Sequence, residues 1–181
     1  MNTFMHNNIP TIFTFISRFT KEKIINLDKN IGIILRNYTE PLDKKNLKEL
    51  VNFCKNQNRK LYLSNNLKIA ANFGFDGVYL PSFNKELGLK KFNFKKNFII
   101  MGSAHNLREI NFKKKQGVQV IFLSPLFITK NYKKNLGVIK FNILTKITRE
   151  KIIALGGINA NNIKKLKITN AYGFSAISYF E

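Results

Sequence analysis

The sequence predicts an α/β protein of the (β/α)8 class, the TIM barrel, and three observations lead to this prediction. Eight short runs rich in β-branched and aromatic residues recur along the 181 residues. Segments with helical periodicity lie between most of them, and the runs are apolar almost throughout, as in parallel strands buried on both faces. Eight is also the number of strands that closes such a sheet. A doubly wound open sheet is the alternative.

The elements follow in chain order. The runs expected to form strands are 10–17, 31–38, 60–65, 77–82, 98–104, 118–125, 151–158 and 172–180. The segments expected to form helices are 20–27, 42–58, 66–74, 106–117, 137–148 and 159–169. In the second of these helices, Leu47, Leu50, Val51 and Cys54 fall on one face. Because no helical pattern follows the last strand, we expect the final barrel helix to be absent or replaced by the N-terminal segment.

Length and composition indicate one domain spanning residues 1–181, since the chain is long enough for one sizeable core and short for two. It has no apolar run of membrane-spanning length, and its start lacks the features of a secretory signal. We therefore expect a soluble, cytoplasmic protein with no membrane partner. The single cysteine, Cys54, is expected in the core.

The net charge of +21 at pH 7 admits nucleic acid as a partner but does not favour it. The lysines are scattered over every expected helix and loop, and no nucleic-acid-binding motif accompanies them. The chain is also rich in Asn, Ile and Phe, which share A/T-rich codons with Lys. Most of the charge is therefore expected on solvated helix faces, where it is compatible with small anionic substrates.

A glycine pair, Gly156 and Gly157, follows the seventh expected strand in the stretch KIIALGGINANNIKKL. In a (β/α)8 barrel, phosphate groups favour the loops after strands seven and eight. The glycines allow a phosphate to approach backbone N–H groups, and Asn159 would cap a helix whose N-terminus favours an anion. Ile177 and Ser178 would add N–H donors from strand eight. A plain strand-to-helix turn is the alternative.

The order of the other loop motifs points to a family. GIILRNY, LYLSNN, FDGVYLPS, IIMGSAHNLREI, VIFLSPLFITKNYKKNLG, IIALGGINANNI and GFSAIS occur in the same order and at similar intervals as in the thiamine-phosphate synthase/TenI family. The chain resembles that family from about Ile31 to Ser178. The family fold is a (β/α)8 barrel, which agrees with the fold expected from the alternation.

The resemblance implies a transferase that joins hydroxymethylpyrimidine diphosphate to thiazole phosphate, giving thiamine phosphate and pyrophosphate with the help of Mg²⁺. It implies that Arg36 contacts the pyrophosphate, that Ser103 contacts the departing group and that Thr129 lies near the phosphate groups. It implies that the thiazole phosphate is held by the backbone N–H groups of Gly156, Gly157, Ile177 and Ser178. Small phosphorylated substrates are the implied partners, and a homo-oligomer stays open.

The chain also departs from the family pattern. An Asn-Asp pair after strand three is replaced by Ser64 and Asn65, and a second magnesium-binding aspartate after strand four is replaced by Asn84. Amides at these positions would make a weak Mg²⁺ site and leave the diphosphate as the main ligand of the metal. The family threonine-lysine end of the strand-six loop falls on Asn131 and Tyr132, although Lys130, Lys133 and Lys134 lie close by and could restore charge.

These departures keep other functions open. TenI-like relatives aromatise a thiazole carboxylate phosphate, and His105 matches a histidine that acts as acid and base in them. Capping of the next helix, together with Asn106, is the structural alternative for His105. A barrel that binds thiazole or thiamine phosphate without catalysis is a third possibility. Asp76 is expected to be a turn residue.

Overall fold

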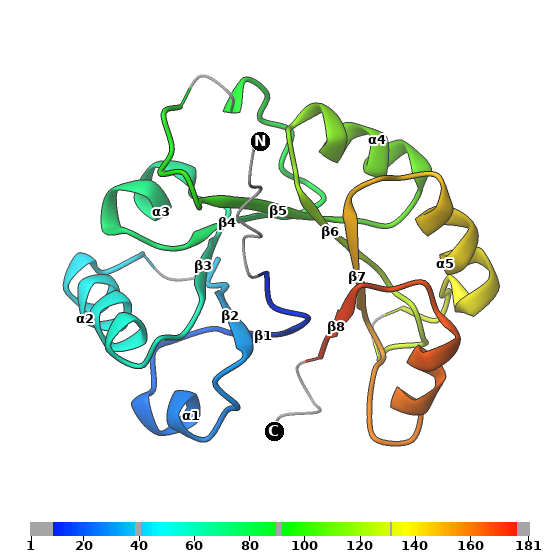
Figure 1. Cartoon of the computed structure of the whole chain (residues 1–181), viewed down its shortest axis with the longest axis horizontal. Helices are drawn as coiled ribbons and strands as arrows, with labels where there is room; N and C mark the ends of the chain where they lie inside the picture. Colours follow the sequence, from blue (N-terminus) through cyan, green and yellow to red (C-terminus); the bar gives the residue numbers. More distant parts are fainter. Residues whose placement is uncertain (1–8, 39–40, 90–91, 131, 177–181) are drawn as a thin grey trace, which may run out of the picture.

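The computed structural model describes residues 9–38, 41–89, 92–130 and 132–176. Eight parallel strands, each paired with its neighbours in the chain, form a closed barrel in which β8 returns to β1 (Figure 1). The strands are β1 (Ile12–Ile16), β2 (Ile31–Leu35), β3 (Leu61–Ser64), β4 (Gly77–Leu80), β5 (Ile99–Ala104), β6 (Val120–Leu123), β7 (Lys151–Leu155) and β8 (Gly173–Ser175). The barrel and all eight predicted strands are confirmed, and the open sheet is excluded.

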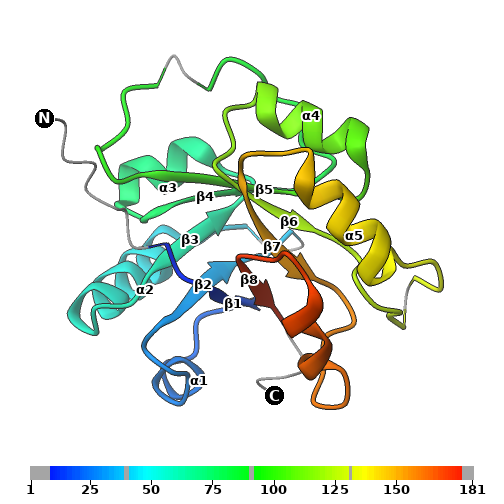
Figure 2. The same cartoon turned by 45° about the vertical axis from the view of Figure 1, so that its right-hand side comes forward.

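The helices lie on the outside of the barrel (Figures 1 and 2). They are α1 (Lys21–Ile25), α2 (Lys44–Asn56), α3 (Leu67–Phe73), α4 (Leu107–Lys115) and α5 (Gly137–Lys146). Asp43, Asn66 and Asn106 cap α2, α3 and α4 by accepting hydrogen bonds from backbone N–H groups of the first turn. Five of the six predicted helices are therefore confirmed, with ends that differ by at most two residues.

The sixth prediction, an α-helix over 159–169, is wrong, although Asn159 Oδ1 accepts from the N–H of Asn161 at 3.0 Å as the expected capping residue would. Residues 159–162 form turns, and η2 (Ile163–Ile168) is a 3-10 helix. Asn162 causes this difference, because its Oδ1 accepts from the N–H of Asn159 at 2.9 Å and its Nδ2 donates to the carbonyl of Gly157 at 2.6 Å. These bonds hold the chain in a turn where the first α-helical turn was expected.

No helix follows β8 among the described residues, which reach Ala176 on that side. Ile177 and Ser178, the residues after it and the segment before residue 9 lie outside the described residues. The expectation about the final helix therefore stays a prediction. In the described part of the chain, no helix is both long and apolar enough to span a membrane.

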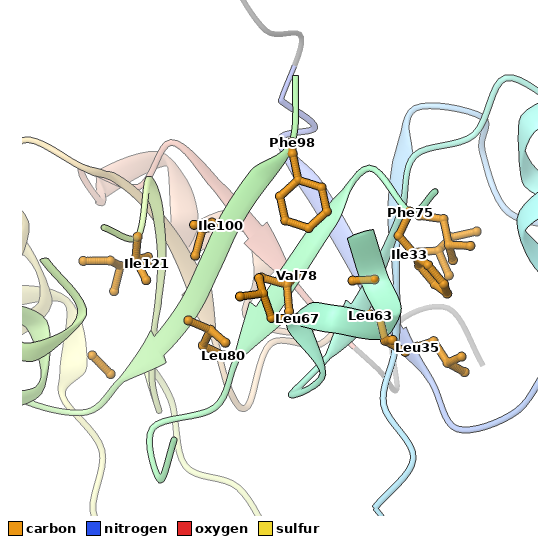
Figure 3. Packing of buried hydrophobic residues seen from close by; sticks show 14 of the residues in the cluster. Ile33, Leu35, Leu63, Leu67, Phe75, Val78, Leu80, Phe98, Ile100 and Ile121 are labelled. Atoms are coloured by element: carbon orange, nitrogen blue, oxygen red, sulfur yellow. The ribbon is translucent and has the colours of Figure 1, made fainter. Parts of the chain in front are cut away.

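Two hydrophobic clusters hold the barrel together. The larger lies between the strands and the helices and includes Ile33, Leu63, Val78 and Ile100 (Figure 3), with Cys54 also buried in it, as predicted. The smaller fills the inside of the barrel and consists of Phe13, Phe15, Ile34, Tyr62, Tyr79, Ile99, Met101, Val120, Phe122 and Ile153. Successive residues of a strand point to opposite faces, so β2 to β7 each supply buried residues to both clusters. The interior is therefore packed and leaves any ligand to the ends of the strands.

Candidate active site

The carboxyl ends of the strands bring the predicted site residues to one end of the barrel. Arg36 directly follows β2, Ser64 ends β3, Ser103 lies near the end of β5 and Gly156 directly follows β7. Three rings in the interior cluster lie at the same end. The Tyr79 ring centroid is 5.2 Å from that of Phe15 and 5.2 Å from that of Phe122, in edge-to-face contacts. We call Phe15, Tyr79 and Phe122 the aromatic floor, because they separate the strand ends from the rest of the interior.

Arg36 is fixed above this floor. Its guanidinium carbon lies 4.7 Å from the centroid of the Phe15 ring, in a cation–π contact. Its backbone N–H donates to the carbonyl of Ile16 at 2.8 Å, which continues the pairing of β2 with β1. The side chain is thus held from below while the residue stays exposed. A planar, multi-donor cation in this place suits the oxygens of a diphosphate.

A cavity of about 570 Å³ adjoins Arg36. Arg18 and Lys23 also line it, together with the hydroxyl-bearing side chains of Ser17 and Thr20. The described residues of its lining include no carboxylate. The cavity therefore favours an anionic group next to Arg36.

Hydroxyl groups surround the floor. Burial raises the pKa of Tyr79 to about 12, against a smaller lowering by its hydrogen bond with Ser103, so Tyr79 stays neutral at physiological pH. Ser103 is 6% exposed. The hydroxyl oxygens of Tyr38 and Ser64 lie 2.7 Å apart and form a hydrogen bond between the ends of β2 and β3. Sequence patterns predict no role for Tyr79, whose only signal is its place one residue before the end of β4.

Asn65 and Asn84, which replace the two family aspartates, are in contact. Asn84 Nδ2 donates to Asn65 Oδ1 at 2.9 Å. The oxygen of Asn84 accepts from the backbone N–H of Glu86 at 3.1 Å and from Gln116 Nε2 at 3.0 Å. Both amide oxygens are thus engaged by protein donors. Neither carries a charge, and no cluster of three or more His, Cys, Asp or Glu side chains suited to a metal occurs in the described part of the chain. These residues do not fit a protein-held Mg²⁺ ion, which prefers free carboxylate oxygens.

Two buried side chains of the α4 segment support the loop after β4. Lys113 and Gln116 are each 1% exposed. Lys113 Nζ donates to the carbonyl of Pro81 at 2.7 Å and to Gln116 Oε1 at 2.8 Å. Burial, and to a lesser degree the charge of Lys85, lower the pKa of Lys113 to about 8, against an opposite effect of Glu109. Lys113 is a clear exception to the expectation that the lysines lie on solvated helix faces.

The glycine pair adopts a conformation that favours glycine, with φ of +95° at Gly156 and +72° at Gly157. The loop after β6 lies directly against both residues. A Cβ on Gly156 would lie 2.8 Å from Pro125 Cβ, and one on Gly157 would lie 2.7 Å from the carbonyl carbon of Phe127. Contact with the loop after β6 is thus enough to explain why both positions are glycine, which agrees with the alternative of a plain strand-to-helix turn. Whether a phosphate binds there stays a prediction.

The loop after β6 brings Thr129 to the same end of the barrel. Thr129 Oγ1 accepts from the backbone N–H of Tyr132 at 3.0 Å, which closes a short turn. Lys130 lies within this turn and Lys133 follows it; both are exposed, so their charges are available to an anion. The loop is joined to the glycine turn by a hydrogen bond of 3.0 Å from the N–H of Phe127 to the carbonyl of Gly156.

His105 is joined to the cap of α4. Its Nδ1 lies 2.8 Å from Glu109 Oε2, and its backbone N–H donates to the same oxygen at 3.0 Å. Burial acts to raise the pKa of Glu109, but these hydrogen bonds and that from Asn106 outweigh it and lower the pKa. Asn106 and Glu109 also exchange two hydrogen bonds, as in a capping box. The observed contacts therefore agree with the structural alternative, in which His105 and Asn106 cap the helix. Asp76 accepts from Lys60 and from the N–H of Leu61, away from the site, as expected for a structural residue.

A family model and relatives similar in sequence point to one family. The family model "Thiamine monophosphate synthase" matches residues 29–180. A thiamine-phosphate synthase of Prochlorococcus marinus (strain MED4) is 34% identical over 142 residues, which are 76% of this chain and 40% of that protein. A putative thiamine-phosphate synthase 2 of Aquifex aeolicus is 32% identical over 137 residues, 74% of this chain and 72% of that protein. The chain thus matches only about 40% of the length of its Prochlorococcus relatives.

Among solved structures, the thiamine phosphate pyrophosphorylase of Pyrococcus furiosus superposes with a TM-score of 0.74 at 17% identity, covering 95% of this chain and 87% of that one. At this identity the likeness shows the shared barrel fold. The family match over most of the sequence, together with the barrel that carries its motifs at the strand ends, shows that this chain belongs to the thiamine monophosphate synthase family.

Proposed function

We propose that this protein transfers the hydroxymethylpyrimidine group from its diphosphate to the ring nitrogen of thiazole phosphate, producing thiamine phosphate and pyrophosphate. Membership of the family supports the reaction class. The single observation that carries the proposal to this chain is Arg36, held over the aromatic floor by Phe15, near the cationic cavity it shares with Arg18 and Lys23.

In the proposed reaction, the bond between the pyrimidine methylene carbon and the diphosphate oxygen breaks, and pyrophosphate leaves with the electron pair. The lone pair of the thiazole nitrogen then forms the new carbon–nitrogen bond, so no protein nucleophile is needed. The protein orients the two substrates and stabilises the departing negative charge. Arg36 supplies a charged donor for this, and Ser103 a hydroxyl.

The thiazole phosphate would lie at the other side of the barrel end. Gly156 and Gly157 offer close backbone approach, and Thr129 with Lys130 and Lys133 lies on the adjoining loop. The N–H groups of Ile177 and Ser178 complete this half of the site in the proposal. No step of the reaction is assigned here to a metal held by the protein, because the amide oxygens of Asn65 and Asn84 are occupied.

The contact between His105 and Glu109 favours a second candidate, the TenI-like aromatisation of a thiazole carboxylate phosphate. A carboxylate 2.8 Å from Nδ1 orients the imidazole, an arrangement suited to proton transfer at its other nitrogen. Transferase activity does not need this pair. Replacement of His105 by Asn would therefore abolish the aromatisation and reduce the transferase reaction only slightly.

The test is to incubate the purified protein with the pyrimidine diphosphate and thiazole phosphate, with Mg²⁺ or with EDTA, and to measure thiamine phosphate as its oxidised fluorescent product. The Arg36→Ala variant should lose most activity. Arg108→Ala, which removes an exposed arginine of α4, is the matched control and should keep it. Absence of product in both conditions, with thiazole phosphate still bound, would refute the transferase and favour the second candidate or a binding role.

A further inference from the structure

A directed chain of hydrogen bonds fixes the orientation of the Asn84 amide. It begins at Lys113, whose ammonium group can only donate and therefore defines which end of Gln116 carries the oxygen. The other end of Gln116 must then be its NH2 group, which donates to the carbonyl of Glu86 at 2.7 Å and to Asn84 Oδ1 at 3.0 Å. The backbone N–H of Glu86, which also can only donate, points to the same Asn84 oxygen at 3.1 Å.

As a result, Asn84 turns its NH2 group toward Asn65. One of the two hydrogens goes to Asn65 Oδ1 at 2.9 Å, which in turn fixes Asn65 with its own NH2 group on the other side. Among the described residues, none accepts a hydrogen bond from Asn65 Nδ2 or from the second hydrogen of Asn84 Nδ2. Asn65 is exposed and Asn84 is partly exposed, so these donors are open to a ligand.

This arrangement reverses the chemistry of a metal site at the same positions. Two carboxylates are acceptors only; they attract a cation and repel a phosphate. Two amides that present N–H groups are neutral donors, and they suit the oxygens of a phosphate directly. Because the amide oxygens face protein donors, a metal would have to displace those hydrogen bonds before it could bind.

We infer that Asn65 and Asn84 bind the diphosphate through their side-chain N–H groups, without a metal between them, and that Gln116 is the positioning residue that keeps Asn84 in this orientation. The inference rests on the proposed function for the identity of the anion. The loop that carries Asn84 lies at the end of β4 and Asn65 directly follows β3, so the pair adjoins the side of the barrel where Arg36 follows β2. Together these residues form a metal-independent site for a diphosphate group.

The test uses inorganic pyrophosphate in isothermal titration calorimetry, with EDTA and with Mg²⁺. The wild-type protein should bind pyrophosphate in EDTA. Asn65→Asp combined with Asn84→Asp should lower that metal-free affinity by about ten-fold or more, because each donor becomes a repelling acceptor. The same double variant should regain affinity when Mg²⁺ is added. A purely structural role of the pair does not predict this reversal of metal dependence.

Gln116 is tested by Gln116→Met, which keeps the length of the side chain but cannot orient Asn84. Metal-free affinity should fall by about three-fold to ten-fold, the loss expected for one hydrogen bond. Gln57→Met at the exposed end of α2 is the matched control and should leave affinity unchanged. Because Gln116 is buried, thermal unfolding accompanies the binding assay. If Gln116→Met does not fold, the aspartate variants, which lie on partly or fully exposed loops, still decide the matter.

Two results would overturn the inference: wild-type protein that binds pyrophosphate only with Mg²⁺, or aspartate variants with unchanged affinity in EDTA. Neither result depends on turnover. Metal-free pyrophosphate binding without formation of thiamine phosphate would instead refute the proposed function and leave the inference standing.

Discussion

Substitution of Gly157 by Ala gives the sharpest test of the site's construction. At Gly157, φ is +72°, and a Cβ would lie 2.7 Å from both the carbonyl carbon and the carbonyl oxygen of Phe127, with Ile128 O closer still. The positive φ costs about 1–2 kcal/mol for any residue other than glycine. Contact with backbone, which cannot rotate away, adds about 1–3 kcal/mol. We therefore expect Gly157→Ala to lower the free energy of unfolding by about 2–5 kcal/mol.

Gly137→Ala is the matched control, since its φ is +66° and no atom lies within 4 Å of a Cβ built there. It carries the conformational cost alone, about 1–2 kcal/mol. Both variants restrict the unfolded chain equally, so their difference isolates the contact with the loop after β6. Urea unfolding followed by circular dichroism measures both values. Equal losses for the two variants would show that the loop yields to the new methyl group and that the close packing described above is not required.

Three other predictions concern the site and its support. Arg36→Ala should raise the KM for the diphosphate by about 10-fold to 100-fold, because a charge-assisted contact is lost, and should leave the affinity for thiazole phosphate nearly unchanged. Kinetics measures the first and calorimetry the second, and an equal weakening of both would contradict the assignment of Arg36 to the diphosphate. Burial raises the pKa of Cys54 to about 12, so its thiol should react with a disulfide reagent only in denaturant, and rapid reaction of the native protein would refute its burial. The pKa of Lys113 is about 8 in the folded protein and 10.5 in the unfolded chain, so the unfolded chain binds more protons between these pH values. The free energy of unfolding, relative to that of Lys113→Met, should therefore rise by about 3 kcal/mol from pH 8 to 10.5. A difference that does not change with pH in urea titrations would exclude the lowered pKa.

The strand ends explain how much of the site the sequence predicts. Arg36, Asn65 and Ser103 are far apart in the chain, yet each follows an apolar run or lies near its end, and parallel strands bring such positions to one edge. Their neighbourhood is therefore predictable once the alternation is recognised. The orientation of a side-chain amide is not predictable in this way, because it depends on hydrogen-bond partners that another segment of the chain supplies.

Lys113 and Gln116 show this limit. In the sequence, Lys113 lies in a basic stretch and resembles a solvated lysine. Only the tertiary packing buries its side chain. Its side chain crosses Gly102, where a Cβ would lie 3.0 Å from Lys113 Cδ, so a glycine on β5 makes the room for it. The failed α-helix over 159–169 has a similar cause, since Asn162 forms bonds within the turn that outweigh the helical periodicity.

The closure of the barrel between β8 and β1 has a consequence for how this protein folds. Among the described residues, which reach Ala176 after β8, two pairs join these strands, Ile12 with Phe174 and Phe13 with Ser175, whereas five pairs join β1 and β2. Contacts between chain positions so far apart require a large loss of loop entropy, so the neighbouring βα units should form before this last junction does. The junction is then the natural place for local opening of the native state. Amide hydrogens of Phe174 and Ala176, which bond to the carbonyls of Thr11 and Phe13, should exchange with solvent earlier than those in the β4–β6 part of the sheet.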